Sequence, residues 1–255
     1  MNLQLYTALN QYGCMPGNNF TIAVHGWMES AQNQWVQPML ANFSKYRRGC
    51  VMFMQYGHGP TYESYFSVLL PNFDGLANLL VQFLRRLETL GFDAGNGLLF
   101  GFSFGGQLVL EAGRRLGTQK LGRIDVCEPA GPGFDDNGTY SAAILKNSAK
   151  KVQCIYTGLM FSSLNRNCHV NWKMGFCGIS QPASGAVLSD HNICPYFYNS
   201  AFENRFPAMA KPLYCLSTKA AISWPQNFRM GFFCDVNSGA TGDFYAKTSS
   251  VFPYN

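Results

Sequence analysis

Charged residues are scarce in this chain, at 13% of 255 residues against about 25% in a typical soluble protein. Hydrophobic residues make up 47% and aromatic residues 15%, so the composition excludes an intrinsically disordered chain and a coiled coil. The formal net charge of +5 comes from 19 basic and 14 acidic residues that are scattered without runs. A nucleic-acid-binding surface needs a concentrated basic patch, so we expect no nucleic-acid partner.

Long apolar stretches are also missing. No uninterrupted apolar run approaches the roughly 18 residues that a membrane span needs. The first ten residues, MNLQLYTALN, lack the basic and long apolar regions of a signal peptide. The length suits one large hydrophobic core, so we expect a soluble chain with a single domain over residues 1–255.

Closely spaced cysteine pairs are absent, although the chain has nine cysteines. None forms a CxxC pair or a Cys/His cluster with zinc spacing, so no metal site is expected. Disulfides formed in an oxidising compartment explain the cysteines better. An odd count leaves at least one thiol over, and Cys127 is our candidate for a buried free thiol because it lies in an apolar run. Sequons at Asn19, Asn42 and Asn137 agree with a secreted glycoprotein whose signal peptide has been removed.

Short apolar, β-prone runs alternate with helical patterns along the chain. The predicted strands are 20–24, 51–54, 97–100, 123–127 and 151–156, with strand-like segments at 228–234 and 244–247. The predicted helices are 74–90, 106–116 and 194–205. This alternation indicates an α/β fold with a mostly parallel central sheet and helices on both faces.

The segment Gly101-Phe-Ser103-Phe-Gly105 matches G-x-S-x-G and lies between a predicted strand and a predicted helix. In that context the motif forms a tight turn with a strained backbone, which raises the serine hydroxyl at the start of the helix. Ser103 is therefore the candidate nucleophile. A glycine-rich turn without chemistry would give the same pentapeptide.

A serine nucleophile needs a base, and the chain has only four histidines. His25 and His58 precede Ser103, and the usual chain order of serine, acid and histidine in this fold disfavours them. His169 and His191 remain. We favour His191, in a polar loop before the third predicted helix, and expect His169 to pack in a disulfide loop.

The acid should lie at the end of a strand that follows the serine. Glu128 ends the predicted strand 123–127, and the next residue, Pro129, stops that strand; Asp125 is the competitor. A carboxylate so placed would orient the imidazole. The oxyanion hole requires backbone N–H groups from the residue after the serine and from the loop after an early strand, for which Phe104 and Trp27 are the candidates.

Several motifs together resemble the animal pancreatic-type lipase family, with its insect and phospholipase A1 branch as the nearest likeness. The motifs are His25-Gly-Trp27, the serine turn, Glu-Ala-Gly-Arg114, Gly-Arg-Ile-Asp-Val-Cys-Glu-Pro-Ala-Gly-Pro132 and Asp-His191, and the match extends from Leu5-Tyr-Thr7 to Gly-Asp-Phe-Tyr-Ala-Lys-Thr248. The resemblance implies a disulfide-linked α/β-hydrolase catalytic domain with a Ser103, Glu128 and His191 triad and no cofactor. It also implies a lipid or fatty-acid-like substrate and transient contact with a membrane or micelle surface. Because the second domain of vertebrate lipases is not in the sequence, no colipase partner is expected.

The chain departs from this family at functional positions. Glu128 stands where Asp is usual, and Phe102 and Phe104 replace the usual histidine and leucine of the serine turn. We expect Phe102 to line a narrow apolar pocket for one unbranched chain. Only 16 residues separate Cys177 from Cys194, where the family carries its lid, and a short lid is typical of phospholipase-like members.

The main functional hypothesis is a secreted, lipid-active carboxylester hydrolase that uses Ser103, His191 and Glu128. An alternative is a dehydratase acting on a fatty-acid derivative such as a lipid hydroperoxide, with His191 removing a C–H proton; the altered neighbours of Ser103 and His191 motivate it. A third hypothesis is a non-enzymatic lipid carrier of the insect yolk-protein type. The presence of all three triad candidates argues against a carrier.

Overall fold

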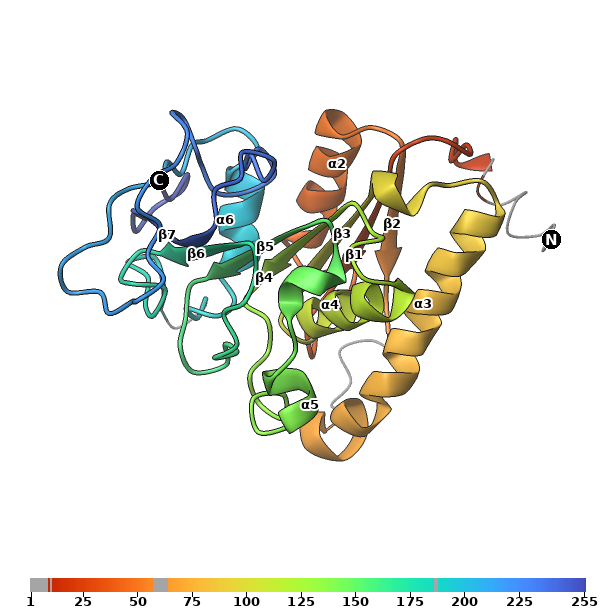
Figure 1. The fold of residues 1–255 in the computed structure, drawn as a ribbon, viewed down its shortest axis with the longest axis horizontal. Helices are drawn as coiled ribbons and strands as arrows, with labels where there is room; N and C mark the ends of the chain where they lie inside the picture. The colour runs from red at the N-terminus through yellow and green to blue at the C-terminus, as the bar shows by residue number, and fades with distance from the viewer. Residues whose placement is uncertain (1–8, 10, 57–63, 186–187) are drawn as a thin grey trace. The chain divides into compact units, whose positions relative to one another are not determined.

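The computed structural model describes residues 9, 11–56, 64–185 and 188–255 (Figure 1). The chain divides into two compact units. The first comprises residues 1–124 with 147–150, and the second comprises residues 125–146 with 151–255. The predicted strand of Leu5-Tyr-Thr7 and His58 lie outside the described residues.

Three parallel strands form the centre of the first unit. They are β1 (Phe20–Val24), β2 (Cys50–Met54) and β3 (Gly97–Phe102), and β1 pairs with both of the others. The register places Val24 opposite both Met54 and Gly101. The carboxyl ends of the three strands therefore meet at one edge, so the loops that follow β1 and β2 and the turn that follows β3 lie together.

Helices surround these strands in the first unit. They are α2 (Val36–Tyr46), α3 (Phe73–Thr89) and α4 (Phe104–Leu116), with a π-helical turn at Tyr65–Leu69 and 3-10 turns at Leu70–Asn72 and Ala94–Asn96. Helix α3 has an acidic residue, Asp74, in its first turn, which favours the positive end of the helix dipole. It is followed by Gly91 with φ of +90°, the usual left-handed glycine after a helix.

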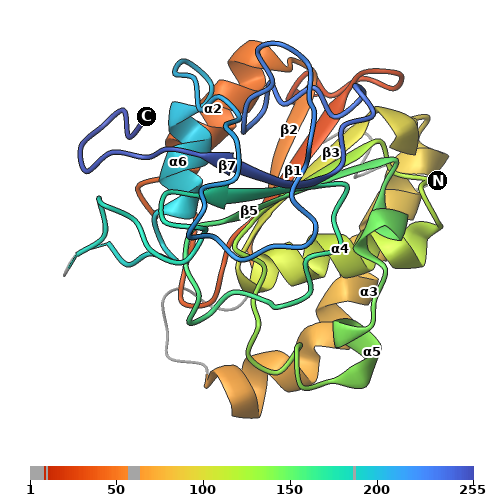
Figure 2. The same cartoon turned by 60° about the vertical axis from the view of Figure 1, so that its left-hand side comes forward.

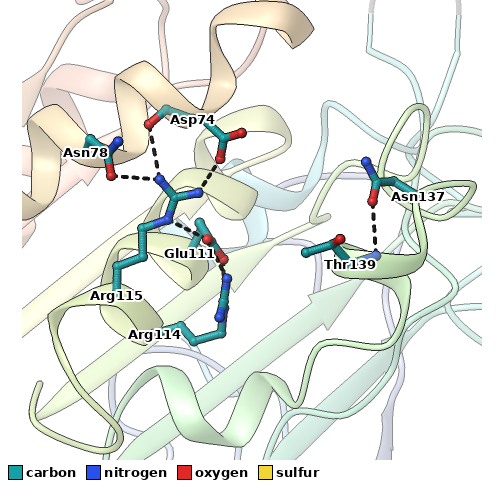
Figure 3. Close-up of polar contacts among 7 residues, drawn as sticks. All are labelled: Asp74, Asn78, Glu111, Arg114, Arg115, Asn137 and Thr139. Carbon is teal, nitrogen blue, oxygen red and sulfur yellow. Dashed lines mark hydrogen bonds and ion pairs between the residues drawn. The ribbon is translucent and has the colours of Figure 1, made fainter.

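Helix α3 packs against α4, as both views show (Figure 1 and Figure 2). The buried glutamate Glu111 on α4 accepts hydrogen bonds from Arg114 and Arg115 of the same helix. Figure 3 shows that the Arg115 guanidinium also reaches Asp74 and Asn78 on α3. The stretch 65–89 is long and apolar enough to cross a membrane by length and composition alone. Its buried apolar residues and the ion pair of Asp74 with Arg115 on α4 are those of a helix packed within a folded unit.

The second unit also has three parallel strands at its centre. These are β5 (Lys151–Tyr156), β6 (Val170–Met174) and β7 (Gly242–Ala246), with β6 paired to both neighbours. Its helices are α5 (Gly138–Ser141) and α6 (Cys194–Ser200), and a 3-10 turn covers Leu145–Ser148. The chain passes between the units within β4 (Arg123–Cys127), and the strand order is β2-β1-β3-β4-β5-β6-β7.

The parallel strands and helices confirm the predicted α/β-hydrolase fold. Among the labelled elements of the described residues, α2, the short helix α5 and β6 were not predicted. The predicted strand 228–234 is wrong: this segment has turns and a single bridge, between Pro207 and Arg229. Helix α6 is shorter than expected and ends at Ser200. A single domain over residues 1–255 stays a prediction.

The predicted disulfides are present, and there are four of them. Cys14–Cys50 lies in the first unit, whereas Cys127–Cys194, Cys154–Cys168 and Cys177–Cys215 lie in the second. The prediction that Cys127 is the free thiol is wrong. The ninth cysteine, Cys234, is buried and lies outside the four disulfides. An apolar run correctly indicated that Cys127 is buried, but it carries no information about a partner 67 residues away.

Candidate active site

Ser103 occupies the turn between β3 and α4 with a backbone that only glycine adopts readily. Its φ and ψ are 54° and −120°, and the residue is 8% exposed. Both glycines of the motif are needed for close packing. A Cβ on Gly101 would lie 2.5 Å from the carbonyl oxygen of Gly105, and a Cβ on Gly105 would lie 2.3 Å from that of His25. The strained serine turn expected from the motif is therefore present.

The loop after β1 is held by His25, which is almost fully buried. Its Nδ1 lies 2.7 Å from the Gly26 carbonyl oxygen, and its ring stacks on Tyr56 at 4.3 Å. The Tyr56 hydroxyl donates a hydrogen bond to the His25 carbonyl oxygen at 2.8 Å. Burial lowers the pKa of the His25 imidazole, against the opposite effect of its hydrogen bond to Gly26. A neutral ring with its proton on Nδ1 satisfies these contacts.

Glu29 fixes the same loop from its other side. One carboxylate oxygen accepts the Gly26 N–H at 2.8 Å, and the other accepts the indole N–H of Trp35 at 2.8 Å and the Asn33 amide at 3.2 Å. The loop between these anchors carries Trp27, whose side chain is 42% exposed. The candidate oxyanion residue therefore lies in a segment with a fixed backbone. Its role as an N–H donor stays a prediction.

The two phenylalanines of the serine turn lie in the aromatic core of the first unit. The Phe104 ring contacts the rings of Tyr56, Tyr65 and Phe73, and it is fully buried. The Phe102 ring is 2% exposed and contacts Trp35 at 6.1 Å. The pocket role of Phe102 and the oxyanion role of the Phe104 amide stay predictions.

In the second unit, Glu128 follows β4 and is completely buried. Its Oε2 lies 3.0 Å from Nδ1 of His191. Its Oε1 accepts the backbone N–H of Thr157 and, at 3.0 Å, that of Gly158. Like Ser103, Glu128 has a positive φ, of 49°. The carboxylate is therefore held on one side by two amides, with the imidazole on the other.

Asp125 and His169, the alternatives to Glu128 as acid and to His191 as base, have other hydrogen-bond partners. Asp125 accepts the hydroxyl proton of Tyr198 at 2.5 Å. His169 accepts the Val152 N–H on Nδ1 at 3.1 Å and lies next to Cys168 of the Cys154–Cys168 disulfide, as expected. Burial lowers the pKa of the His169 imidazole.

The loop that carries His191 is tied to the segments that follow β5 and β6. The Asp190 carboxylate accepts the Gln181 N–H at 2.6 Å, and the Asp190 carbonyl accepts the Thr157 hydroxyl at 2.6 Å. The Phe161 ring meets the imidazole edge-on at 5.6 Å. Neither Thr157 nor Gln181 was predicted from the sequence. Thr157 directly follows a predicted strand and could have been found by its position, whereas no pattern marks Gln181.

The anchoring roles of His25 and Glu29 were also not predicted. The strand before His25-Gly26 was predicted, but His25 was weighed only as a base that comes too early in the chain.

The expected short lid between Cys177 and Cys194 is not closed by a disulfide, since Cys177 pairs with Cys215 and Cys194 with Cys127. Among the described residues, no three His, Cys, Asp or Glu side chains gather as a metal site.

Comparison with known proteins decides the family. The family model named Lipase matches residues 10–176, which is more than half of the chain. The chain belongs to the lipase family. Pancreatic lipase-related protein 2 of Bos taurus is 30% identical over 113 residues, and that of Homo sapiens is 27% identical over 114 residues. Each match covers 44% of this chain and 24% of the relative, so the chain aligns with about a quarter of these curated proteins.

The resemblance to pancreatic-type lipases is thereby confirmed. Membership of the insect and phospholipase A1 branch stays a prediction. Among solved structures, the ydeN gene product of B. subtilis is 16% identical with a TM-score of 0.42, over 59% of this chain and 77% of that one.

Proposed function

We propose that this member of the lipase family hydrolyses carboxylic esters of lipids with Ser103 as nucleophile, His191 as base and Glu128 as the orienting acid. The observation that carries the proposal is the 3.0 Å contact between His191 and a fully buried Glu128 that two backbone amides also bind. The strained turn at Ser103 supports the choice of nucleophile.

The contacts of His191 define its role in this mechanism. A proton on Nδ1 is donated to Glu128, which leaves Nε2 to accept the proton of the Ser103 hydroxyl. The serine oxygen attacks the ester carbonyl, and the carboxylate stabilises the imidazolium that forms. The imidazolium then protonates the departing alcohol, and water removes the acyl group from the serine. In this proposal the amides of Trp27 and Phe104 bind the oxyanion.

The proposed substrate class is esters of long acyl chains. Exposed apolar side chains lie on the loop after β1 and on the π-helical turn, where Trp27, Met28 and Phe66 are 42%, 46% and 65% exposed. Such residues suit transient contact with a lipid or micelle surface. With Phe102 lining the pocket, kcat/KM for soluble esters should rise with acyl length by at most about fourfold per methylene, the value set by about 0.8 kcal/mol of transfer free energy. A flat profile would contradict the lipid substrate.

We also propose that the protein is secreted and glycosylated. Four disulfides suit an oxidising compartment. Of the three sequons, Asn137-Gly-Thr139 is exposed at every residue.

The experiment that tests the enzyme assignment is labelling with a fluorophosphonate probe followed by mass spectrometry. We expect one adduct on Ser103 in the native protein. The Ser103→Ala variant should lose labelling and ester hydrolysis while its melting temperature stays nearly unchanged. Native protein that is not labelled, or a variant that keeps its turnover, would overturn the nucleophile. Conversion of a lipid hydroperoxide without ester hydrolysis would favour the dehydratase, and fatty-acid binding without either reaction would favour the carrier.

A further inference from the structure

The side chain of Gln181 uses both its N–H groups and its oxygen in hydrogen bonds, although it is only 5% exposed. Its Nε2 donates to the carbonyl oxygens of Thr157 at 2.8 Å and Met174 at 2.9 Å. Its Oε1 accepts the Thr248 hydroxyl at 2.8 Å. One amide thus joins the residue after β5, the last residue of β6 and the segment after β7. A buried amide with so many partners has little freedom to move.

A single peptide group links the hydrogen bond between Gln181 and Thr157 to the carboxylate of Glu128. The carbonyl oxygen of Thr157 and the N–H of Gly158 belong to the same planar peptide unit and point to opposite sides of it. Gln181 binds the oxygen, and Glu128 accepts the N–H at 3.0 Å. The orientation of this peptide therefore couples the glutamine to the position of the carboxylate.

Gln181 also reaches the histidine loop. Its backbone N–H donates to the carboxylate of Asp190 at 2.6 Å, one residue before His191. The loop after β5 and the loop that carries His191 are in close contact, because a Cβ on Gly158 would lie 3.1 Å from the Cβ of Asp190 and 3.2 Å from the backbone nitrogen of His191. Gln181 is therefore linked to Glu128 through the 157–158 peptide and to His191 through Asp190.

We propose that Gln181 is a positioning residue that sets the geometry of the Glu128 and His191 pair. This inference rests on the proposed function. Among the described residues Gln181 makes no hydrogen bond to the imidazole or to the carboxylate, and it acts through the 157–158 peptide and Asp190. Small displacements of catalytic groups reduce rates strongly, by up to about a hundredfold per ångström.

The direct test is Gln181→Met, which keeps the approximate shape of the side chain and removes its three hydrogen bonds. We expect kcat on a soluble ester to fall by about ten- to a hundredfold with KM changed by less than about twofold. A loss confined to kcat indicates misplaced catalytic groups rather than weaker substrate binding.

The matched control is Gln153→Met. Gln153 is a fully buried glutamine on β5 whose amide oxygen accepts the Gly231 N–H at 3.1 Å and whose Nε2 donates to the Gly231 carbonyl at 3.2 Å. This variant should lose a similar amount of thermal stability and keep its kcat. An equal loss of kcat in both variants would show that Gln181 is merely structural.

A second measurement separates this inference from the proposed function. The proton between His191 Nδ1 and Glu128 should give a downfield proton NMR signal, assigned by its loss in His191→Ala. Gln181→Met should shift or broaden that signal, and Gln153→Met should not.

An inactive native protein would overturn the proposed function, and the signal alone would then decide the positioning role. Unchanged kcat and an unchanged signal in Gln181→Met would overturn that role. Gln181→Glu, which cannot donate to Thr157, replaces the methionine variant if the latter does not fold.

Discussion

Ser103 and Glu128 are both held at backbone angles that cost free energy. Each has a positive φ, and each directly follows the strand that places it, β3 or β4. Such conformations cost about 1–3 kcal/mol and persist only where surrounding contacts enforce them. In Glu128 the two amides that bind Oε1 provide that enforcement. Two of the three proposed catalytic residues therefore have backbone conformations that lower the stability of the fold.

Glu128→Gln tests the acid without removing its anchor. The glutamine oxygen still accepts the N–H groups of Thr157 and Gly158, so its NH2 group must face Nδ1 of His191. That group donates, so the imidazole takes the tautomer with its proton on Nε2 and cannot accept the serine proton. We expect kcat to fall by roughly 10³- to 10⁴-fold, as for the equivalent change in serine proteases, with steady-state kinetics as the measurement.

Asp125→Asn is the matched control for that prediction. Asp125 is fully buried like Glu128, but its carboxylate accepts the Tyr198 hydroxyl. This change should lower the melting temperature and leave kcat within about twofold. A large loss of kcat in Asp125→Asn, with little loss in Glu128→Gln, would show that the acid has been misassigned.

His25 makes the stability of the protein depend on pH. Burial lowers its pKa in the folded state, so below its ordinary pKa of about 6.5 the unfolded chain binds a proton that the folded chain does not. Stability attributable to His25 is therefore complete above about pH 6.5 and falls as the pH drops below that value, with a slope of at most about 1.4 kcal/mol per pH unit.

The measurement for His25 is urea unfolding of the native protein and His25→Gln at pH 7.5 and 5. The variant is expected to be less stable at pH 7.5 because it loses the stacking on Tyr56. The difference between the two proteins should shrink at pH 5. His169→Gln is the control, since burial also lowers the pKa of His169 but that residue is only half-buried, and its effect should be smaller. A difference for His25→Gln that is independent of pH would contradict this account.

Elements with simple apolar periodicity could be predicted from the sequence, whereas elements stabilised by polar pairs could not. Strands β1, β3, β4 and β5 and helix α3 have continuous or periodic apolar residues. Strand β6, Val-Asn-Trp-Lys-Met174, alternates apolar and polar residues, yet every residue is buried. Its lysine, Lys173, is paired with Asp243 on β7 at 2.8 Å, a partner 70 residues away that no local pattern reveals.

The segment 228–234 was predicted as a strand, but the structure has turns there. Its aromatic residues are typical of strands, but Gly231 has a φ of +101° and its N–H and carbonyl are both bonded to Gln153. A side chain on a neighbouring element has replaced the ladder partner that a strand would need. Local composition therefore predicted burial at this position but not backbone conformation.

Lys173→Met should destabilise the pairing of β6 with β7. It leaves Asp243, which is 4% exposed, as a buried carboxylate without its ammonium partner. Removing one member of a buried pair costs about 3–5 kcal/mol. Denaturant unfolding should detect this loss, and the double variant Lys173→Met with Asp243→Leu should recover a large part of it. A single variant as stable as the native protein would show that the pair contributes no net stability.

The candidate site could be predicted from chain order and strand ends, but its support could not. The serine turn, Glu128 and His191 follow from local motifs and from the order of functional groups in this fold. The partners of the cysteines, the anchoring of the loop after β1 by Glu29 and the contacts of Gln181 all depend on which loops the fold brings together. These contacts join residues far apart in sequence, so local motifs indicate a candidate nucleophile, acid and base but not the residues that hold them.

Asn137 is the sequon that the folded protein presents most openly. Asn137, Gly138 and Thr139 are all exposed, and the Asn137 side chain accepts the Thr139 N–H at 3.0 Å (Figure 3). In the sequon at Asn19, Thr21 is fully buried in β1, and Asn42 lies within helix α2. A glycan on Asn137 would therefore displace no packed side chain.

Expression with a signal peptide in a eukaryotic secretory host tests secretion and glycosylation together. We expect a disulfide-linked protein in the medium whose intact mass falls by at least one glycan on treatment with an N-glycosidase. Asn137→Gln should lack that glycan, while Asn137→Asp, which has the same shape and no amide, should lack it with unchanged stability. Asn42→Gln is the control and should keep the full glycan mass of the native product. A native product without a glycan would contradict the glycoprotein assignment, and retention of the full glycan mass in Asn137→Gln would place the modification on another sequon, because oligosaccharide transfer acts on the side-chain amide nitrogen of the acceptor asparagine.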